Sequence, residues 1–128
     1  NKNEEINLYV FFKMISNFKF SMQDYVENYI KCTKPEILIT LIDNNVTFYK
    51  FKQYLPHIKF ISVQNGHRSE NRDWFLNLKK IYNSRKILKS DIYFTCNKEY
   101  GNKVNRYINC QIKPIGSFRN NFVTKKTT

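Results

Sequence analysis

The sequence predicts an α/β protein with a Rossmann-like parallel sheet and flanking helices, and three observations support this fold class. Four short apolar runs recur along the chain, at residues 36–42, 58–63, 91–96 and 111–115. Each run is followed by polar or amide residues, and helix-like segments separate the runs. Runs of Ile, Leu, Val and Phe without polar alternation are typical of parallel strands that are covered on both faces.

The first segment, residues 3–16, is expected to be a helix. It begins with acidic residues and repeats apolar side chains at helical spacing, including Val10 and Met14. A strand over the residues LYVFF is the alternative. Further apolar side chains widen the apolar surface, so this segment is expected to pack in a core, with contact to a membrane surface or to another part of the protein as alternatives.

A second helix is expected from Ser21 to Thr33. Ser21 is a suitable N-cap, and Asp24 at the third helical position completes a capping-box pattern. Pro35 ends the helix, because proline disfavours helical backbone in the residue before it.

The segments between the later runs carry their own signals. Residues 46–54 are long enough for a crossover helix, and residues 98–108 are expected to form another. Residues 67–73 are polar without periodicity, which predicts an exposed loop. The segment that begins at Trp74 is expected to be short, helical or irregular, and to dock on the edge of the sheet.

Composition narrows the range of partners without selecting one. The net charge of +12, from 22 basic and 10 acidic residues, favours anionic partners such as nucleic acid, acidic lipid headgroups or phosphorylated substrates. Three cysteines without a CxxC pair favour a reducing compartment over a disulfide framework or a zinc site.

We expect one domain over residues 1–121, cut from a longer protein, and a polar tail or linker over residues 122–128. No apolar run approaches the roughly 20 residues of a membrane span.

Polar residues follow all four predicted strands. The turns are Asp43-Asn44-Asn45, Gln64-Asn65-Gly66 followed by His67 and Arg68, Cys96-Asn97, and Gly116-Ser117 followed by Arg119 and Asn120. The carboxyl ends of parallel strands lie at one edge of a sheet, and ligands of open α/β sheets gather beyond that edge. The turns are therefore expected to form the functional site. The sequence contains no GxGxxG or P-loop motif.

The ordered set KPEILITLIDNN, ISVQNGHR, DIYFTCNKEYG and IKPIGSFRNN resembles the amino-terminal half of glycosyltransferases of bacterial surface-carbohydrate and lipopolysaccharide biosynthesis. Those enzymes have two Rossmann-like domains, the GT-B architecture, and are related in layout to polyglycerol-phosphate transferases. The resemblance covers residues 25–121. It implies that this chain binds a carbohydrate or lipid-linked acceptor, while a separate carboxyl-terminal domain holds a nucleotide-sugar donor. Alone, the chain is then expected to be inactive, without a cofactor or metal of its own, and to work in the cytoplasm with peripheral contact to the inner face of the membrane.

The resemblance also gives roles to the residues of the turns. Asp43 and His67 are competing candidates for the base that takes the proton of the attacking sugar hydroxyl. For Asp43 the alternative is to cap the helix that begins near Val46, with Asn44 or Asn45 in the same role, and for His67 it is an ordinary loop histidine. The expected substrate contacts are Asn44, Asn45, Gln64, Asn65, Gly66, Arg68, Asn97, Gly116, Ser117, Arg119 and Asn120. Among these, Gly66 permits a positive φ and close approach of a ligand to the backbone.

Two other functions remain open at this point. The basic and aromatic cluster over residues 74–89 is the feature expected of a non-catalytic module that binds nucleic acid, although no RNP, helix-turn-helix or KH motif accompanies it. A polyglycerol-phosphate-type transferase would use the same cleft with a different donor.

Overall fold

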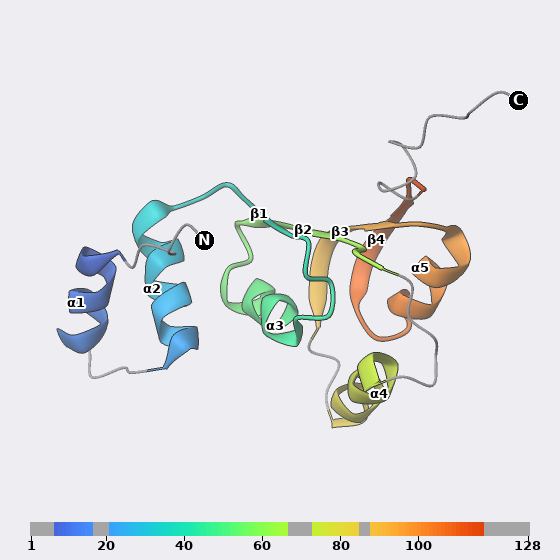
Figure 1. Cartoon of the computed structure of the whole chain (residues 1–128), viewed down its shortest axis with the longest axis horizontal. Coiled ribbons are helices and arrows are strands. Elements are labelled where there is room, and N and C mark those ends of the chain that lie inside the picture. Colours follow the sequence, from blue (N-terminus) through green and yellow to red (C-terminus); the bar gives the residue numbers. More distant parts are fainter. Residues whose placement is uncertain (1–6, 17–20, 67–72, 85–87, 117–128) are drawn as a thin grey trace, which may run out of the picture. The chain divides into compact units, whose positions relative to one another are not determined.

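The computed structural model describes residues 7–16, 21–66, 73–84 and 88–116 of the chain. It consists of two compact units, Asn1–Glu36 and Ile37–Thr128 (Figure 1). Within the described residues, the first contains two helices, and the second contains a four-stranded parallel sheet with three helices. The predicted α/β, Rossmann-like fold class is therefore confirmed. None of the described helices is long and apolar enough to cross a bilayer.

The first unit is a pair of packed helices, α1 (Leu8–Ser16) and α2 (Met22–Thr33). The helical prediction for residues 3–16 is confirmed from Leu8 onward, and the alternative strand is wrong. Val10 and Met14 are buried because their spacing of four residues places both on the same helical face.

The predicted capping box of α2 is present. The backbone N–H of Asp24 donates to Ser21 Oγ at 3.1 Å, and the backbone N–H of Ser21 donates to Asp24 Oδ2 at 3.3 Å. The helix ends at Lys34, whose left-handed backbone (φ 47°) stands directly before Pro35.

In the second unit the strands follow one another in space as they do in sequence. The sheet order is β1-β2-β3-β4, and all three pairings are parallel. The elements are β1 (Ile37–Thr40), α3 (Val46–Tyr54), β2 (Lys59–Val63), α4 (Asp73–Ser84), β3 (Lys89–Thr95), α5 (Lys98–Asn105) and β4 (Asn109–Pro114). The first strand is thus shorter than expected, and the last helix ends three residues before the predicted residue 108.

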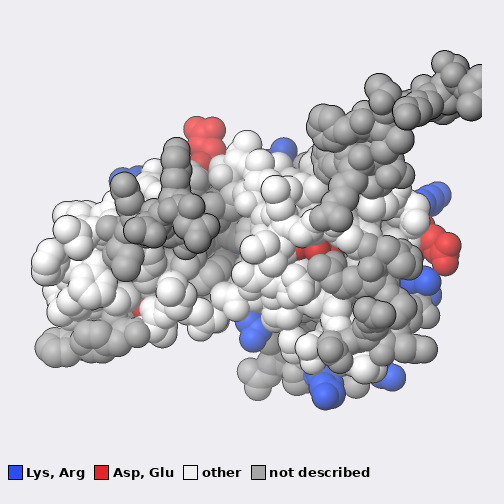
Figure 2. Space-filling model, viewed as in Figure 1, with Lys and Arg blue, Asp and Glu red and all other residues white. Residues whose placement is uncertain are grey.

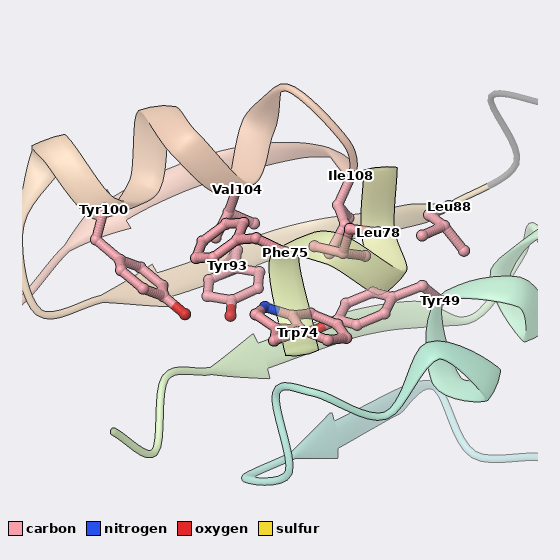
Figure 3. Close-up of a cluster of buried hydrophobic side chains, with 9 residues drawn as sticks. All are labelled: Tyr49, Trp74, Phe75, Leu78, Leu88, Tyr93, Tyr100, Val104 and Ile108. Atoms are coloured by element: carbon pink, nitrogen blue, oxygen red, sulfur yellow. The ribbon is translucent and has the colours of Figure 1, made fainter. Parts of the chain in front are cut away.

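All three helices of this unit pack on the same face of the sheet. Crossovers between parallel strands are right-handed, so an order that advances by one strand each time places every connecting helix on one side. The core shown in Figure 3 agrees with this rule, because α3, α4 and α5 all contribute to it around β3. Its members are Tyr49, Trp74, Phe75, Leu78, Leu88, Tyr93, Tyr100, Val104 and Ile108.

The expectation that helices cover both faces is therefore wrong for the helices of this unit. Ile37 and Ile39, which point to the opposite face of β1, are 49% and 63% exposed. The apolar run misled because α3, α4 and α5 pack on the other face of the sheet and leave this face of β1 without a helix from the second unit.

The segment that begins at Trp74 is helical, which confirms one of its two predicted conformations, but its place in the fold differs from the prediction. It forms the 12-residue helix α4, and Trp74, Phe75 and Leu78 are buried in the core. The expected docking on the sheet edge is wrong, because α4 is the crossover between β2 and β3 and must lie across the face that joins them.

Gly101 allows α5 to approach the sheet closely. A Cβ atom at this position would lie 2.3 Å from Ile112 Cγ2 and 3.2 Å from Thr95 Oγ1. Glycine lowers the intrinsic stability of a helix interior, so its presence here is explained by packing against β4.

Candidate functional site

The carboxyl ends of the four strands meet at one edge of the sheet, as their parallel pairing requires (Figure 1). Beyond the strands, the backbone N–H of Gln64 donates to Phe94 O and that of Ile115 donates to Thr95 O, each at 2.9 Å. These bonds continue the ladder into the turns. The described turns after β1, β2, β3 and β4 thus form one row, which we call the carboxyl rim (residues 43–45, 64–66, 96–97 and 115–116).

Asp43 lies beneath this rim and is fully buried. Its carboxylate accepts a hydrogen bond from the Tyr93 hydroxyl at 2.9 Å to Oδ2 and one from the Asn65 backbone N–H at 3.4 Å to Oδ1. The Tyr49 hydroxyl donates to the Asp43 carbonyl oxygen at 2.6 Å. One residue therefore connects β1 with α3, with β3 and with the turn after β2.

Both tyrosines remain hydrogen-bond donors at any physiological pH. Burial raises the pKa of Tyr93 well above its ordinary value, and the neighbouring Tyr49 and Asp43 raise it further. Burial likewise raises the pKa of Tyr49. Their rings are stacked, with centroids 6.4 Å apart and planes within 7° (Figure 3). The two hydroxyl groups that donate to Asp43 therefore keep their protons, and ring packing holds them in position.

Gln64 is held within the rim by its own amide. Its Oε1 accepts from the Cys96 backbone N–H at 2.8 Å, and its Nε2 donates to the Gly66 carbonyl oxygen at 2.8 Å. The side chain is buried. Gln64, predicted as a substrate contact, therefore joins the turns after β2 and β3 in this structure.

Two predicted contact residues serve as helix caps. Asn45 Oδ1 accepts from the Thr47 backbone N–H at 3.1 Å at the start of α3, and Asn97 Oδ1 accepts from the Tyr100 backbone N–H at 2.7 Å at the start of α5. The cap of α3 is thus Asn45 and not Asp43. Both caps follow a strand directly, so they fix where the polypeptide turns at the rim.

Three further residues of the rim face solvent. Asn44 and Asn65 are exposed, as is Gly116, whose φ is 80°. Gly66 is half-buried and does not have the positive φ that the sequence suggested. The glycine with a left-handed backbone is Gly116 instead. A Cβ atom at either glycine would meet no atom of the described residues within 4 Å.

The other predicted site residues lie outside the described residues. They are His67, Arg68, Ser117, Arg119 and Asn120. Their roles stay predictions. The catalytic role of Asp43 also stays a prediction, although the structure shows that its side chain is buried and hydrogen-bonded.

Sequence reasoning missed the two tyrosines that hold Asp43. Tyr93 lies in the apolar run of residues 91–96, whose pattern predicts a buried strand and says nothing of a partner for the hydroxyl group. A signal was available, because a buried tyrosine hydroxyl needs a polar partner, and Asp43 was the acid predicted for the same edge.

Cys110, on β4, is unsuited to nucleophilic chemistry. Burial raises the pKa of its thiol to about 12, so the reactive thiolate is not populated near neutral pH. Its Sγ donates to the Ile108 carbonyl oxygen at 3.4 Å. Among the described residues, no group of three or more His, Cys, Asp or Glu side chains is arranged to hold a metal ion.

Comparison with known proteins gives one family. A family model described as "putative O-antigen biosynthesis protein" matches residues 61–128. Comparisons with curated proteins and with solved structures found no match. The matched region includes the described turns after β2, β3 and β4, and thus most of the carboxyl rim. Because the model covers more than half of the chain, this protein belongs to the O-antigen biosynthesis family that the model describes.

Proposed function

We propose that the chain is the acceptor-binding half of a GT-B-type glycosyltransferase, which transfers a sugar from a nucleotide-activated donor during O-antigen synthesis. The observation that carries this proposal is the family match over residues 61–128. The parallel sheet supports it, since its polar carboxyl rim is the edge at which open α/β sheets bind ligands. The donor would be held by a second domain, and the acceptor is a carbohydrate or a lipid-linked carbohydrate.

The exposed groups of the rim suit a sugar ligand. Asn44 and Asn65 present amides, which both donate and accept the directional hydrogen bonds that hydroxyl groups make. At Gly66 and Gly116 no described residue would crowd an added Cβ atom, which suits close approach of a ligand to the backbone. The buried bonds of Asp43 and Gln64 hold these turns in place before a ligand arrives, which lowers the entropy cost of binding.

The burial of Asp43 bears on the choice of base. A general base must come within hydrogen-bonding reach of the proton that it takes, and the Asp43 carboxylate is fully buried and bonded to Tyr93 and Asn65. We therefore assign Asp43 to positioning the rim. His67, which follows Gly66 in the sequence, is retained as the candidate base.

The test is a transfer assay on the full-length protein with nucleotide-sugar donors and a lipid-linked acceptor. His67→Ala is expected to lower kcat by about 10²- to 10⁴-fold, the usual contribution of a general base, without changing the free energy of unfolding. His57→Ala is the matched control, because His57 is exposed and precedes β2 at the other end of the sheet. The assignment is wrong if both histidine variants retain full activity.

Other outcomes would replace the proposal. Transfer of glycerol phosphate from a nucleotide-activated donor, with no sugar transfer, would assign a polyglycerol-phosphate-type reaction to the same site. RNA or DNA that copurifies and binds with an affinity falling steeply with salt would assign a nucleic-acid-binding module.

A further inference from the structure

The face of the sheet opposite α3, α4 and α5 is apolar. Side chains alternate between the two faces of a strand. Phe60 packs against Phe48 of α3, with ring centroids 4.9 Å apart, so its neighbour Ile61 points to the opposite face. The register places Ile39, Ile61 and Ile92 side by side there. We call this surface the open face, and its apolar side chains are Ile37, Ile39, Ile61, Val63, Ile92 and Phe94.

The edge strand beside this face lacks the features that protect a sheet edge. Among the described strands, β1 and β4 are the two edges. β4 carries Lys113 and Pro114, and both residue types discourage pairing with a further strand. β1 is Ile-Leu-Ile-Thr, without charge or proline, and Ile37 and Ile39 are 49% and 63% exposed. β1 therefore has the composition of a strand that is paired on both sides.

The direction in which a chain crosses the sheet limits what can cover the open face. Purely parallel sheets are found almost only where both faces are covered. Crossovers are right-handed, so a chain that advances from β1 to β4 places its helices on the α3 side. A chain that moves outward from β1 places its helix on the open face instead. The segment that fits is thus a strand beside β1, a helix on the open face, and a second strand farther out.

Such a segment is longer than any stretch outside the described residues. A strand, a crossover helix and a second strand take roughly 30 residues, whereas the stretches between and beyond the described residues are no longer than 12. The described residues supply no further strand. Doubly wound sheets join two such halves within one polypeptide. We therefore assign the segment to the same polypeptide, outside residues 1–128.

Charge indicates what the segment carries and argues against a second copy of this chain. Of the 22 basic and 10 acidic residues, Asn1–Glu36 holds five of each, which leaves 17 and 5 in Ile37–Thr128. On the face shown in Figure 2, most of the visible Lys and Arg side chains lie over this second unit. Two such units would repel each other. By contrast, acidic residues on a covering helix would be attracted to Lys59 and Lys113, which are exposed on the open face.

We propose that β1 is an inner strand of the full-length protein. A strand-helix-strand segment from outside residues 1–128 pairs with β1 in parallel. Its helix, apolar toward the sheet and acidic at its border, covers the open face. The inference concerns the sheet alone and does not depend on sugar transfer.

The first test measures the reactivity of a thiol on the open face. In the full-length protein, Ile39→Cys is expected to react with a water-soluble maleimide at least about tenfold more slowly than Tyr54→Cys, because a covered side chain reacts only when the structure opens locally. Tyr54 is the matched control, since it is 73% exposed at the end of α3. Mass spectrometry of the labelled peptides separates these thiols from the native cysteines. Equal rates at the two positions would overturn the inference.

Hydrogen exchange gives a second readout without any substitution. An inner strand bonds all of its backbone amides, whereas an edge strand leaves every second one to solvent. In the full-length protein, the amides of Leu38, Ile39 and Thr40 are each expected to exchange as slowly as that of Ile61 in β2. Alternating fast and slow amides along β1 would show that it remains an edge, which contradicts the proposal.

A photoreactive diazirine side chain at position 39 identifies what covers the face. Irradiation of the full-length protein is expected to attach it to a residue of the same polypeptide outside residues 1–128. Attachment within residues 1–128 would mean that this chain covers its own sheet. Attachment between two polypeptides would mean that a second copy does so, and reaction with water alone would mean that the face is uncovered. Each of these three results would overturn the inference.

Discussion

At the scale of single residues, the most consequential group is the Asp43 carboxylate. It is fully buried, and a buried charge is tolerated only where hydrogen bonds replace its lost hydration. Tyr93 and the Asn65 backbone supply such bonds from different strands. The same bonds that compensate the carboxylate thus also fix the turns of the rim.

Tyr93→Phe is expected to lower the free energy of unfolding by about 1–3 kcal/mol, because it leaves a buried carboxylate short of one donor without creating a cavity. Urea denaturation of the variant measures the loss. Tyr54→Phe removes the same hydroxyl from an exposed side chain and should change stability by less than about 0.5 kcal/mol. Equal values for the two variants would show that the Tyr93–Asp43 bond contributes little.

At the scale of elements, the sheet is held to its helices by close contacts at both of its ends. Near the carboxyl rim, Gly101 brings α5 against Ile112 of β4. Near the opposite end, Lys52 of α3 forms an ion pair with Asp91 of β3, with Nζ and Oδ2 2.8 Å apart. Lys52 Nζ also lies 5.6 Å from the centre of the Phe60 ring. Each contact joins a crossover helix to a strand.

Gly101→Ala is expected to destabilise the protein by about 1–3 kcal/mol, although alanine favours a helix interior, because the new methyl group overlaps Ile112. Chemical denaturation measures the change. Asn102→Ala, at the next and exposed position, should be neutral or slightly stabilising. In an Ile112→Ala background the cost of Gly101→Ala should largely disappear, and an unchanged cost would contradict the steric explanation.

The ion pair of Lys52 and Asp91 predicts a defined dependence of stability on pH. Partial burial acts to raise the pKa of Asp91, but hydrogen bonds from Lys52 and the Phe60 backbone N–H outweigh it, so the pKa lies below its ordinary value. A carboxyl group with a lowered pKa in the folded state adds stability above its unfolded pKa of about 3.9 and loses that contribution as the pH falls below it.

Asp91→Asn is therefore expected to be less stable than wild type at about pH 7, with a difference that shrinks as the pH falls below the unfolded pKa of about 3.9. Urea midpoints measured across this range test the prediction. Glu99→Gln is the control, since Glu99 pairs with Lys103 at 3.3 Å but its side chain is 81% exposed, and exposed pairs contribute little. A difference for Asp91→Asn that persists at low pH would contradict the assigned cause.

At the scale of the whole molecule, charge is distributed unevenly along the chain. The 17 basic and 5 acidic residues of Ile37–Thr128 repel one another on balance, whereas Asn1–Glu36 is neutral. This imbalance suits an anionic partner and opposes folding at low ionic strength.

We expect the thermal midpoint to rise as NaCl increases from about 10 to about 150 mM, where the screening length falls from about 30 to about 8 Å. Replacing the exposed Lys79 and Lys80 by Gln should reduce this rise, because it lowers the net positive charge by two. Scanning calorimetry at several salt concentrations provides the measurement. A midpoint that is constant or falls with salt would mean that attractive ion pairs outweigh the repulsion.

Local patterns determined much of this protein. The capping box of Ser21 and Asp24, the bounds of α3 and the four parallel strands with polar turns all follow from residues that are near one another in the chain. Helix caps and crossover lengths depend on residues that are close in the chain, so they can be predicted from a single sequence. For the same reason, the sequence indicated that Asp43 and Gln64 belong to one edge of the sheet.

Only the tertiary structure decided how the residues at that edge are used. Asp43 is bonded to Tyr93, 50 positions away, and Gln64 to Cys96, 32 positions away, and no local pattern specifies such pairs. Likewise, the order in which strands join the sheet, and not the composition of any strand, places all three crossover helices on one face. Burial is set by what packs against a residue, which is why Asp43 is internal and Ile39 is exposed, against the usual preference of each side chain.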